Sequence, residues 1–557
     1  MRLFLLPAAA LLGLLPFAAG SPRPPSAAAP DIDGRLARAW AEEGLKPAPR
    51  CDDATFLRRA SLDITGRIPS PGDVNAFLAD RDPGKRAKAV DRLLASPAYA
   101  DFWAGYWDRV LLGRGLRANQ VDRGAFDAWL RARFAANAPW DATVRELVAA
   151  TGRSSAGDRP KVRRGGFTQV EPGSTDAGVN GAVNWTLKYL QSPQDLGGAA
   201  ARTFLGVQIQ CAQCHDHKTE PWKASDFKAW TSSFAMIRAV PVDRGRTLAP
   251  GQLRRFDLVE TPRVAFVPPK AAEARAYLEA PPKALDGTRL PQDATRRRAL
   301  AAWMTDPKNP WFAQALTNRM WAHFLGRGFV EPFDDLRPSN PARMPELLQA
   351  LSADFAAHGF DLKHLIRVIT ASRAYQLEAG GVEGDRADAL WSRQHLKPLA
   401  PEVLLDALVD ATDLGPVFER VAGERQDRMK QNLLRQFVVL FDVDEDREQE
   451  DFQGTLAQAL LLLNGRLTQD GTRAIPGTAV EQALRLPDDR SRIEALYLRA
   501  LGRPPRADET ARWTAFLEVK RPAPGPAGGA PEAKAQAQAL GDLLWCLLNA
   551  SEFSFNH

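Results

Sequence analysis

The segment Gln208–Trp222, QIQCAQCHDHKTEPW, holds the densest group of residues that could do chemistry. It contains two of the four cysteines and two of the seven histidines of the chain. Cys211, Cys214 and His215 form a C-x-x-C-H motif. Two thiols at this spacing can each form a thioether to a haem vinyl group, and the adjacent histidine can then bind the iron as proximal ligand. Because the motif occurs once, the sequence predicts a single haem c.

Three other interpretations of the motif stay open. Cys211, Cys214 and His217 could bind a transition metal such as zinc, with His215 or Asp216 as a fourth ligand. A zinc site usually takes its second pair of ligands from a distant segment, and the sequence shows no second Cys/His pair. The two cysteines could instead form a disulfide, or the motif could be a structural turn without a cofactor. If haem is bound, we expect His217 and Asp216 near its propionate edge.

The second axial ligand of such a haem has to come from elsewhere in the chain. Met236 or Met320 would raise the reduction potential, and His323 would lower it; an open coordination position is the remaining alternative. His358, His364 and His395 are predicted to be packing or helix-surface residues. His557 is the last residue of the chain, and we expect it to be mobile.

The first 20 residues have the pattern of a cleaved secretory signal peptide. A basic start precedes an apolar stretch that ends in small residues, and Pro7 and Pro16 disfavour a spanning helix. Residues 21–32 are predicted to be a Pro/Ala/Ser-rich tether. We therefore expect an exported protein of the periplasm or cell surface, without a transmembrane segment after cleavage, in a compartment that permits disulfides. There Cys51 and Cys546 could pair or remain separate thiols.

Composition limits the classes of function. The 73 basic and 67 acidic residues nearly balance, and no lysine-arginine block with interleaved aromatic residues occurs, so we expect no nucleic-acid partner. Four cysteines are too few for a disulfide scaffold. The chain shows no Ser-His-Asp order, P-loop or dinucleotide fingerprint, which gives hydrolase, nucleotide or nicotinamide chemistry no support.

Helical periodicity dominates the chain and predicts a mainly α-helical protein with two domains. We place a helical domain at 33–240, a small irregular or β-containing connector at 241–292, and a second helical domain at 293–557 with a flexible insert at 521–536. One helix should begin at Ser70-Pro71, with Asp73 in its first turn. Another is expected over Ser192–Gln210, leading directly into the motif and lining the haem with its apolar face.

Two stretches resemble each other weakly: FLRRASLDITGRIPSPGDVNAFL near the start and LYLRALGRPPRADETARWTAFL near the end. Each is a helix followed by Gly-Arg-x-Pro and a second, capped helix. The pattern indicates either an internal duplication or two helix pairs with the same packing problem.

Three segments together resemble a known two-domain family. FLRRASLDITGRIPS, ARTFLGVQIQCAQCHDH and NPWFAQALTNRMWAHFLGRGFVEPFDDLRPSNP are similar to the planctomycete-type cytochrome-C-like domain of unknown function and its companion domain, which ends in a tail similar to LLNASEF. The resemblance implies export, and it places Cys211, Cys214 and His215 on the C-x-x-C-H of the family and His217 on its following histidine. It implies no reaction.

Polar residues gather after the tryptophan-rich helix of the companion domain: Arg319, Arg327, Asp334, Asp335, Arg337 and Asn340. They indicate either a cleft for a carbohydrate or acidic partner, or an ion-pair network that holds two helices, which we favour. For the whole chain we expect a haem c protein that transfers electrons to a redox or cell-envelope partner. The alternatives are a surface enzyme and an assembly or binding protein, in which the motif holds another metal or a disulfide.

Overall fold

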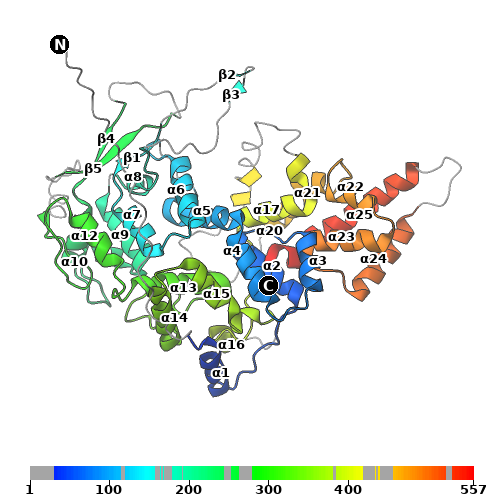
Figure 1. The fold of residues 1–557 in the computed structure, drawn as a ribbon, viewed down its shortest axis with the longest axis horizontal. Coiled ribbons are helices and arrows are strands. Elements are labelled where there is room, and N and C mark those ends of the chain that lie inside the picture. The colour runs from blue at the N-terminus through cyan, green and yellow to red at the C-terminus, as the bar shows by residue number, and fades with distance from the viewer. Residues whose placement is uncertain are drawn as a thin grey trace, which may run out of the picture.

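A computed structural model describes most of the chain after residue 29, and it is mainly α-helical as predicted (Figure 1). The described residues are 30–114, 119–156, 163–164, 167–168, 178–190, 192–243, 252–261, 279–380, 384–417, 433–434, 437–438, 456–521 and 530–557. The predicted signal peptide, most of the tether and half of the insert at 521–536 lie outside this set. The other half is described, and a helix begins within it at Ala530, so that part of the insert is not a flexible segment. No helix in the described ranges is long and apolar enough to cross a membrane.

The first part of the chain forms a series of α-helices and short 3₁₀ helices. These are α1 (Ile32–Glu42), α2 (Asp53–Thr65), α3 (Pro71–Ala79), α4 (Lys85–Ala95), α5 (Pro97–Leu112), α6 (Arg123–Ala135), α7 (Trp140–Val148), α8 (Val183–Lys188), α9 (Pro193–Leu205), the 3₁₀ helix η1 (Ile209–Gln213), α10 (Ala224–Thr231) and η2 (Ser232–Phe234). The start of α3 is as predicted, because Ser70 accepts a hydrogen bond from the backbone N–H of Asp73 and Pro71 is the first helical residue.

The second part is also helical. Its elements are α12 (Arg296–Met304), α13 (Phe312–Leu325), α14 (Pro345–Ala357), α15 (Leu362–Ala371), η3 (Ala374–Gln376), α16 (Asp385–Ala389), α17 (Pro401–Thr412), α20 (Leu456–Asn464), α21 (Arg466–Gly471), α22 (Ala479–Leu484), α23 (Asp489–Leu501), α24 (Ala507–Lys520), α25 (Ala530–Leu548) and α26 (Ser551–Ser554).

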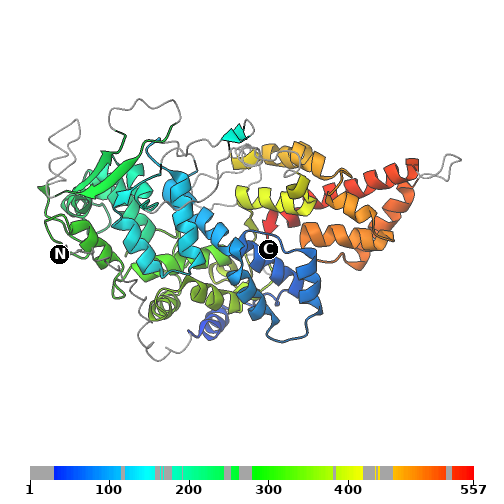
Figure 2. The same cartoon turned by 45° about the horizontal axis from the view of Figure 1, so that its top comes forward.

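Short strands occur mainly around the predicted connector, which confirms its β content. β1 (Gly152–Arg153), β5 (Phe256–Glu260) and β4 (Ile237–Pro241) form a three-stranded antiparallel sheet in that order. β2 (Arg163–Arg164) pairs with β3 (Phe167–Thr168), and β6 (Lys397–Pro398) pairs with β7 (Phe555–Asn556). The larger sheet lies at one end of the long axis and α22 to α25 at the other (Figures 1 and 2).

Two large hydrophobic cores and one small cluster occur in the described residues, and the boundary between the large cores does not fall at the predicted connector. The larger core takes residues from Ile32 to Trp391, with Leu498, and so combines helices from both sides of the connector. The smaller core is built from α17 to α26 with Leu62 and Ile68. Helices from both predicted domains thus contribute side chains to the same hydrophobic core, and the two domains pack together through it.

The two similar sequence stretches have the same local geometry. α2 ends at Gly66 with φ 64°, and α23 ends at Gly502 with φ 67°, both in the left-handed conformation that glycine adopts without a steric penalty. The two helix pairs also meet, since Gly502 lies against Pro69 and the Cβ atom of Arg58.

The chain end is anchored, so the prediction of a mobile His557 is wrong. Its carbonyl accepts a hydrogen bond of 2.8 Å from Arg59 Nε on α2. The neighbouring Asn556 donates to Asp63 Oδ1, also on α2, at 2.8 Å. Asp63 further accepts hydrogen bonds from Lys397 at 2.6 Å and from the hydroxyl of Tyr375 at 2.9 Å. This buried network joins the first helices to the last residues.

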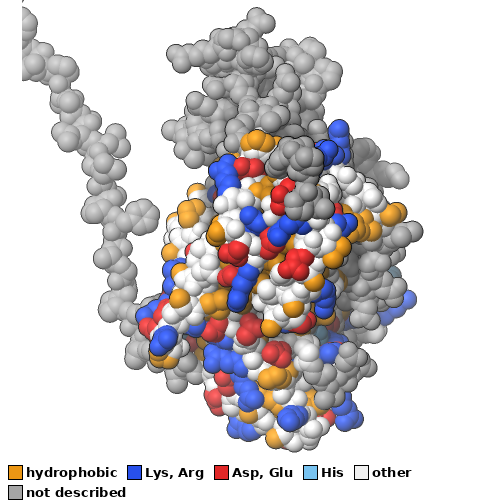
Figure 3. Space-filling model, turned by 90° about the vertical axis from the view of Figure 1, so that its right-hand side faces the viewer, with side chains coloured by type: hydrophobic (Ala, Val, Ile, Leu, Met, Phe, Trp, Pro, Cys, Tyr) orange, Lys and Arg blue, Asp and Glu red, His pale blue; other side chains and the backbone are white. Residues whose placement is uncertain are grey.

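Charged side chains of both signs are interspersed over the end of the molecule formed by the C-terminal helices (Figure 3). That view shows no large patch of one sign. Single hydrophobic side chains are scattered between them, which is ordinary for a protein surface.

Candidate functional site

The C-x-x-C-H motif lies on and just after η1, which follows α9 through a tight turn. Helix α9 is shorter than predicted, because Gly206 takes a left-handed conformation with φ 65° and ends the helix at Leu205. Gln208 then leads the chain into η1 at Ile209. The motif therefore stands on a separate short turn and is not a continuation of the helix.

The apolar face of α9 packs into the protein core. Phe204 contacts Trp185 with ring centroids 5.5 Å apart and Trp140 at 6.3 Å, and it is 2% exposed. Leu196 and Leu205 are also buried in the larger core. The prediction that this face lines a haem is wrong, because neighbouring helices already cover it.

The companion domain holds the motif segment in place through the loop after α13. The carboxylate of Asp334 accepts hydrogen bonds from Arg202 Nε at 2.6 Å and from Gln208 Nε2 at 3.1 Å. Two residues later, the backbone N–H of Leu336 donates to the carbonyl of Gly206 at 2.6 Å. The motif is thus positioned by contacts that join residues far apart in sequence.

Three of the polar residues named in the sequence, Asp334, Asp335 and Arg337, form ion pairs, which join the loop to α9 and to itself and do not link two helices. Asp335 pairs with Arg337 at 3.0 Å, and burial raises the pKa of the Asp335 carboxyl. Ser339 donates from its hydroxyl to the carboxylate of Glu220, which lies just after the motif. The guanidinium of Arg319 lies over the ring of Phe333, 4.4 Å from its centroid.

The reactive side chains of the motif point to solvent. Ile209 and Ala212 are buried and anchor the turn, whereas Cys211, Cys214 and His215 are exposed. Both cysteines are free thiols. Two thiols and an imidazole are therefore accessible on the same five-residue stretch, as attachment of a cofactor from solution would require.

His215 is held in the orientation that suits a proximal ligand. Its Nδ1 lies 2.8 Å from the backbone carbonyl oxygen of Asp216. A carbonyl only accepts, so this contact places the proton on Nδ1 and leaves the lone pair on Nε2 for a metal. The Cys211, Cys214 and His215 donor set therefore fits the thioether and proximal-ligand positions of a haem c.

His217 has a different role in this geometry. Its Nδ1 accepts hydrogen bonds from the backbone N–H groups of Thr219 at 3.3 Å and Glu220 at 3.1 Å. The backbone N–H of His217 donates to the backbone carbonyl of Trp222 at 2.8 Å. The contacts at Nδ1 leave the proton of the neutral ring on Nε2. His217 thus organises the turn after the motif and presents no free lone pair to a metal. Asp216 accepts from the N–H of Ala224 at the start of α10, at 2.9 Å.

The donor atoms of the motif do not form a compact metal cluster. Across the described ranges, one group of three or more His, Cys, Asp or Glu ligand atoms comes within 4.8 Å, and it lies on α14 and α15. A tetrahedral zinc site needs ligand atoms that converge on one ion at about 2.0–2.3 Å. The arrangement of Cys211, Cys214, His215 and His217 is therefore less suited to zinc than to separate attachment points.

The proposed sixth ligands lie in the core. Met320 and His323 are both on α13, and Met320 is fully buried. His323 Nε2 lies 2.9 Å from the carbonyl oxygen of Asp63, and the ring packs against Trp103 at 5.1 Å between centroids. Burial lowers the pKa of the His323 imidazole to about 4. These contacts are with α2 and α5, and the placement gives no support to a ligand role for either residue.

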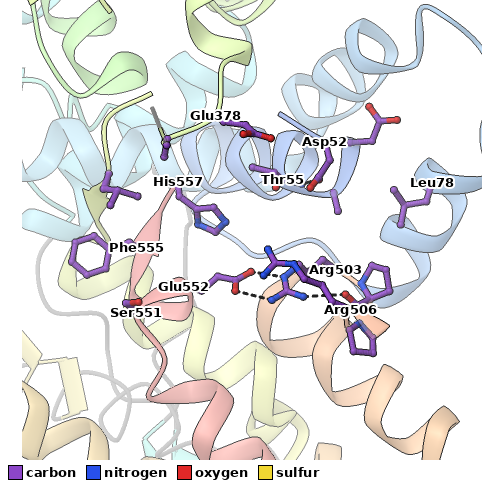
Figure 4. Close-up of a pocket in the computed structure, with 17 residues that line it drawn as sticks. Asp52, Thr55, Leu78, Glu378, Arg503, Arg506, Ser551, Glu552, Phe555 and His557 are labelled. Carbon is purple, nitrogen blue, oxygen red and sulfur yellow. Dashed lines mark hydrogen bonds and ion pairs between the residues drawn. The ribbon is translucent and has the colours of Figure 1, made fainter. Parts of the chain in front are cut away.

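A cavity of about 800 Å³ lies away from the motif, where α2 meets the last residues of the chain (Figure 4). Asp52 lies on one side, and Arg503 pairs with Glu552 at 2.6 Å on the other. Its lining includes Leu78 and Leu396, which are 37% and 59% exposed. Sequence reasoning missed this cavity because its lining residues come from segments hundreds of positions apart.

Cys51 and Cys546 are both free thiols. Cys51 is buried beside Arg86, and Cys546 is exposed on α25. Of the two arrangements left open by the sequence, the structure has the separate thiols.

Two family descriptions match the chain. Residues 31–239 match PSCyt2, a protein of unknown function (DUF1549), and residues 296–517 match PSD1, a protein of unknown function (DUF1553). Comparisons with curated proteins and with solved structures gave no match. The motif on η1 lies in the first matched region, and the loop that holds it lies in the second. The chain therefore carries two domains of unknown function, a PSCyt2 domain followed by a PSD1 domain.

Proposed function

We propose that this chain is an exported monohaem c protein that transfers electrons in the cell envelope. In this proposal Cys211 and Cys214 form the thioethers, and His215 binds the iron. The observation that carries it is the exposure of both free thiols next to an imidazole whose Nδ1 is held by the Asp216 carbonyl. Haem bound there supplies one-electron redox chemistry.

The residues around the motif prepare it for this role. The Nδ1–H contact with the carbonyl keeps the His215 ring in one tautomer and raises the basicity of Nε2. The anchoring of Gln208 by Asp334 holds the turn that carries the thiols. Because the motif is exposed and the apolar face of α9 is buried elsewhere, the bound group would be open to solvent and to a partner surface.

The exposure of the motif supports electron transfer to a protein partner, because a partner surface could reach the bound haem. The protein would accept one electron from a reduced partner and pass it to an oxidised one, with no bond formed or broken. Export rests on the signal-like pattern of residues 1–20, because haem attachment to C-x-x-C-H takes place outside the cytoplasm.

The test is a haem determination on the full chain, exported from a host that carries the cytochrome c maturation machinery. A haem stain on a denaturing gel and a pyridine haemochrome spectrum would be recorded for the wild type, Cys211→Ala and Cys214→Ala. Cys546→Ala, which removes another exposed thiol, is the matched control. We expect a covalent signal in the wild type and the control, and its weakening or loss in the motif variants.

His215→Ala separates attachment from ligation. We expect this variant to retain haem through the thioethers but to show an altered Soret band, because the proximal ligand is missing. Folded, exported wild-type protein without haem would overturn the proposal. Metal analysis and thiol counting would then decide between a metal-binding turn and a disulfide, and would favour the surface-enzyme or assembly-protein alternative.

A further inference from the structure

Asp354, His358 and His364 come together where α14 ends and α15 begins, far from the motif in sequence. Asp354 lies in the last turn of α14, His358 follows that helix, and His364 is in the first turn of α15 (Figure 1). One ligand atom of each residue lies within 4.8 Å of the others. Sequence reasoning predicted both histidines to be packing or surface residues, and nothing in their spacing alone indicated a shared site.

The carboxylate of Asp354 is buried and faces the two imidazoles. Its side chain is 4% exposed. Oδ2 lies 2.7 Å from His364 Nε2. Oδ1 lies 3.2 Å from His358 Nδ1 but accepts no hydrogen bond, because that nitrogen lies closer, at 2.8 Å, to the backbone carbonyl oxygen of Asp354. In the described part of the chain, Asp354 forms ion pairs with these imidazoles and with no lysine or arginine. A buried carboxylate oxygen without a donor is costly unless a cation is supplied.

The two imidazoles complete a donor set with an open side. Their rings are stacked with centroids 3.7 Å apart and planes 19° apart. An imidazole binds a metal ion through the lone pair of a ring nitrogen, in its neutral form. The side chains of His358 and His364 are 17% and 24% exposed, which leaves an approach from solvent.

The hairpin between the helices holds these residues in place. Gly359 and Phe360 have φ of 66° and 55°, which makes the turn tight. The Phe360 ring packs on Phe312 and Phe355 at 5.4 and 5.3 Å, and its carbonyl accepts from the N–H of Trp140. The carbonyl end of α14 also favours a positive charge at this point.

We propose that Asp354, His358 and His364 bind one divalent transition-metal ion of the zinc class, with solvent at the remaining positions. The ion would take the place of the proton between Asp354 Oδ2 and His364 Nε2. His358 would release its Nδ1 proton, and with it the contact to the Asp354 carbonyl oxygen, to offer a lone pair. Ligand atoms about 2.0–2.2 Å from a zinc ion lie about 3–4 Å apart, close to the spacing found here. The rings would have to rotate apart slightly, because a bound ion lies in the plane of each imidazole. Such a site is independent of haem attachment.

The test uses Co²⁺ and Zn²⁺ on the chelator-treated full chain carrying Cys211→Ala and Cys214→Ala, so that no motif thiolate competes. Cobalt gives visible d–d bands when bound, without the thiolate charge-transfer band of a cysteine site. We expect one equivalent of Co²⁺, displaced by Zn²⁺. Lys363→Gln changes a neighbour of His364 that offers no ligand and should leave binding within about threefold.

His364→Ala and Asp354→Asn should each weaken binding by at least about a hundredfold, since even outer-shell partners of metal ligands are worth ten- to hundredfold. Circular dichroism in chelator checks that each variant is folded, and His358→Gln replaces any variant that is not. Absence of d–d bands in the folded parent, or binding unaffected by loss of a ligand residue, would overturn the metal site.

Discussion

Acid should destabilise this protein through His323, and the size of the effect can be worked out from its surroundings. The ring is enclosed by Phe102, Trp103 and Tyr106, and its Nε2 lies 2.9 Å from the carbonyl oxygen of Asp63. Nε2 carries the proton that is donated to this carbonyl, so a further proton would add to Nδ1 and charge a ring that is largely removed from water. Burial is the largest cause of the lowered pKa, which falls from 6.5 to about 4, and the nearby Asp63 carboxylate offsets it only in part.

The sign follows from the proton balance. Between pH 6.5 and about 4 the unfolded chain takes up a proton at His323 and the folded protein does not. The free energy of unfolding therefore falls as the pH drops through this window, and the stabilisation is fully present above it. At about 1.4 kcal/mol per pH unit, the difference between the two pKa values amounts to about 3 kcal/mol.

The assay is urea unfolding at pH 7 and pH 4 for the wild type and His323→Gln. Glutamine can still donate to the Asp63 carbonyl but has no proton to gain. We expect the variant to lose about 3 kcal/mol less than the wild type between these pH values, whatever other groups contribute to both. Equal losses in the two proteins would refute the reasoning and would mean that His323 is protonated in the folded state or exposed to water.

Three further predictions concern the buried network at Asp63 and the contacts that hold the motif segment. Lys397→Met leaves the buried Asp63 carboxylate without its ion pair of 2.6 Å and should lower the unfolding free energy by about 3–5 kcal/mol. Adding Asp63→Asn to this variant should recover part of the loss. A double-mutant cycle by urea unfolding measures the coupling, and strictly additive effects would contradict the prediction. Asp334→Ala removes the carboxylate that accepts hydrogen bonds from Arg202 and Gln208. It should lower stability by about 1–3 kcal/mol and increase protease cleavage near the motif. Unchanged proteolysis would show that other contacts hold the segment. Gly206→Ala forces an alanine into the left-handed conformation and places its Cβ 2.9 Å from Leu336. We expect thermal unfolding to show a loss of at least about 1–2 kcal/mol of stability. Gly380→Ala, whose Cβ would meet nothing within 4 Å, is the control and should lower stability by less.

Local signals in the sequence were enough for the helical class, the two matched domains and several element ends. The Ser70-Pro71 start of α3 depends on a side chain that caps the backbone three residues away, so it can be predicted from neighbours alone. The strands of the connector follow from β-prone residues with proline punctuation. The exposed C-x-x-C-H motif is likewise a local pattern, because its chemistry lies within five residues.

What the tertiary structure decided depends on residues far apart in sequence. From its sequence, the apolar face of α9 could line a cofactor or join a core. It joins the core, because Trp140 and Trp185 pack against its Phe204. From the sequence, His323 could be an iron ligand or a packing residue. In the structure its ring contacts α2 and α5. Sequence periodicity shows that a face is apolar, but it does not show which surface covers that face. Packing supplies the partner, and with it the burial that sets the charge and accessibility of each group.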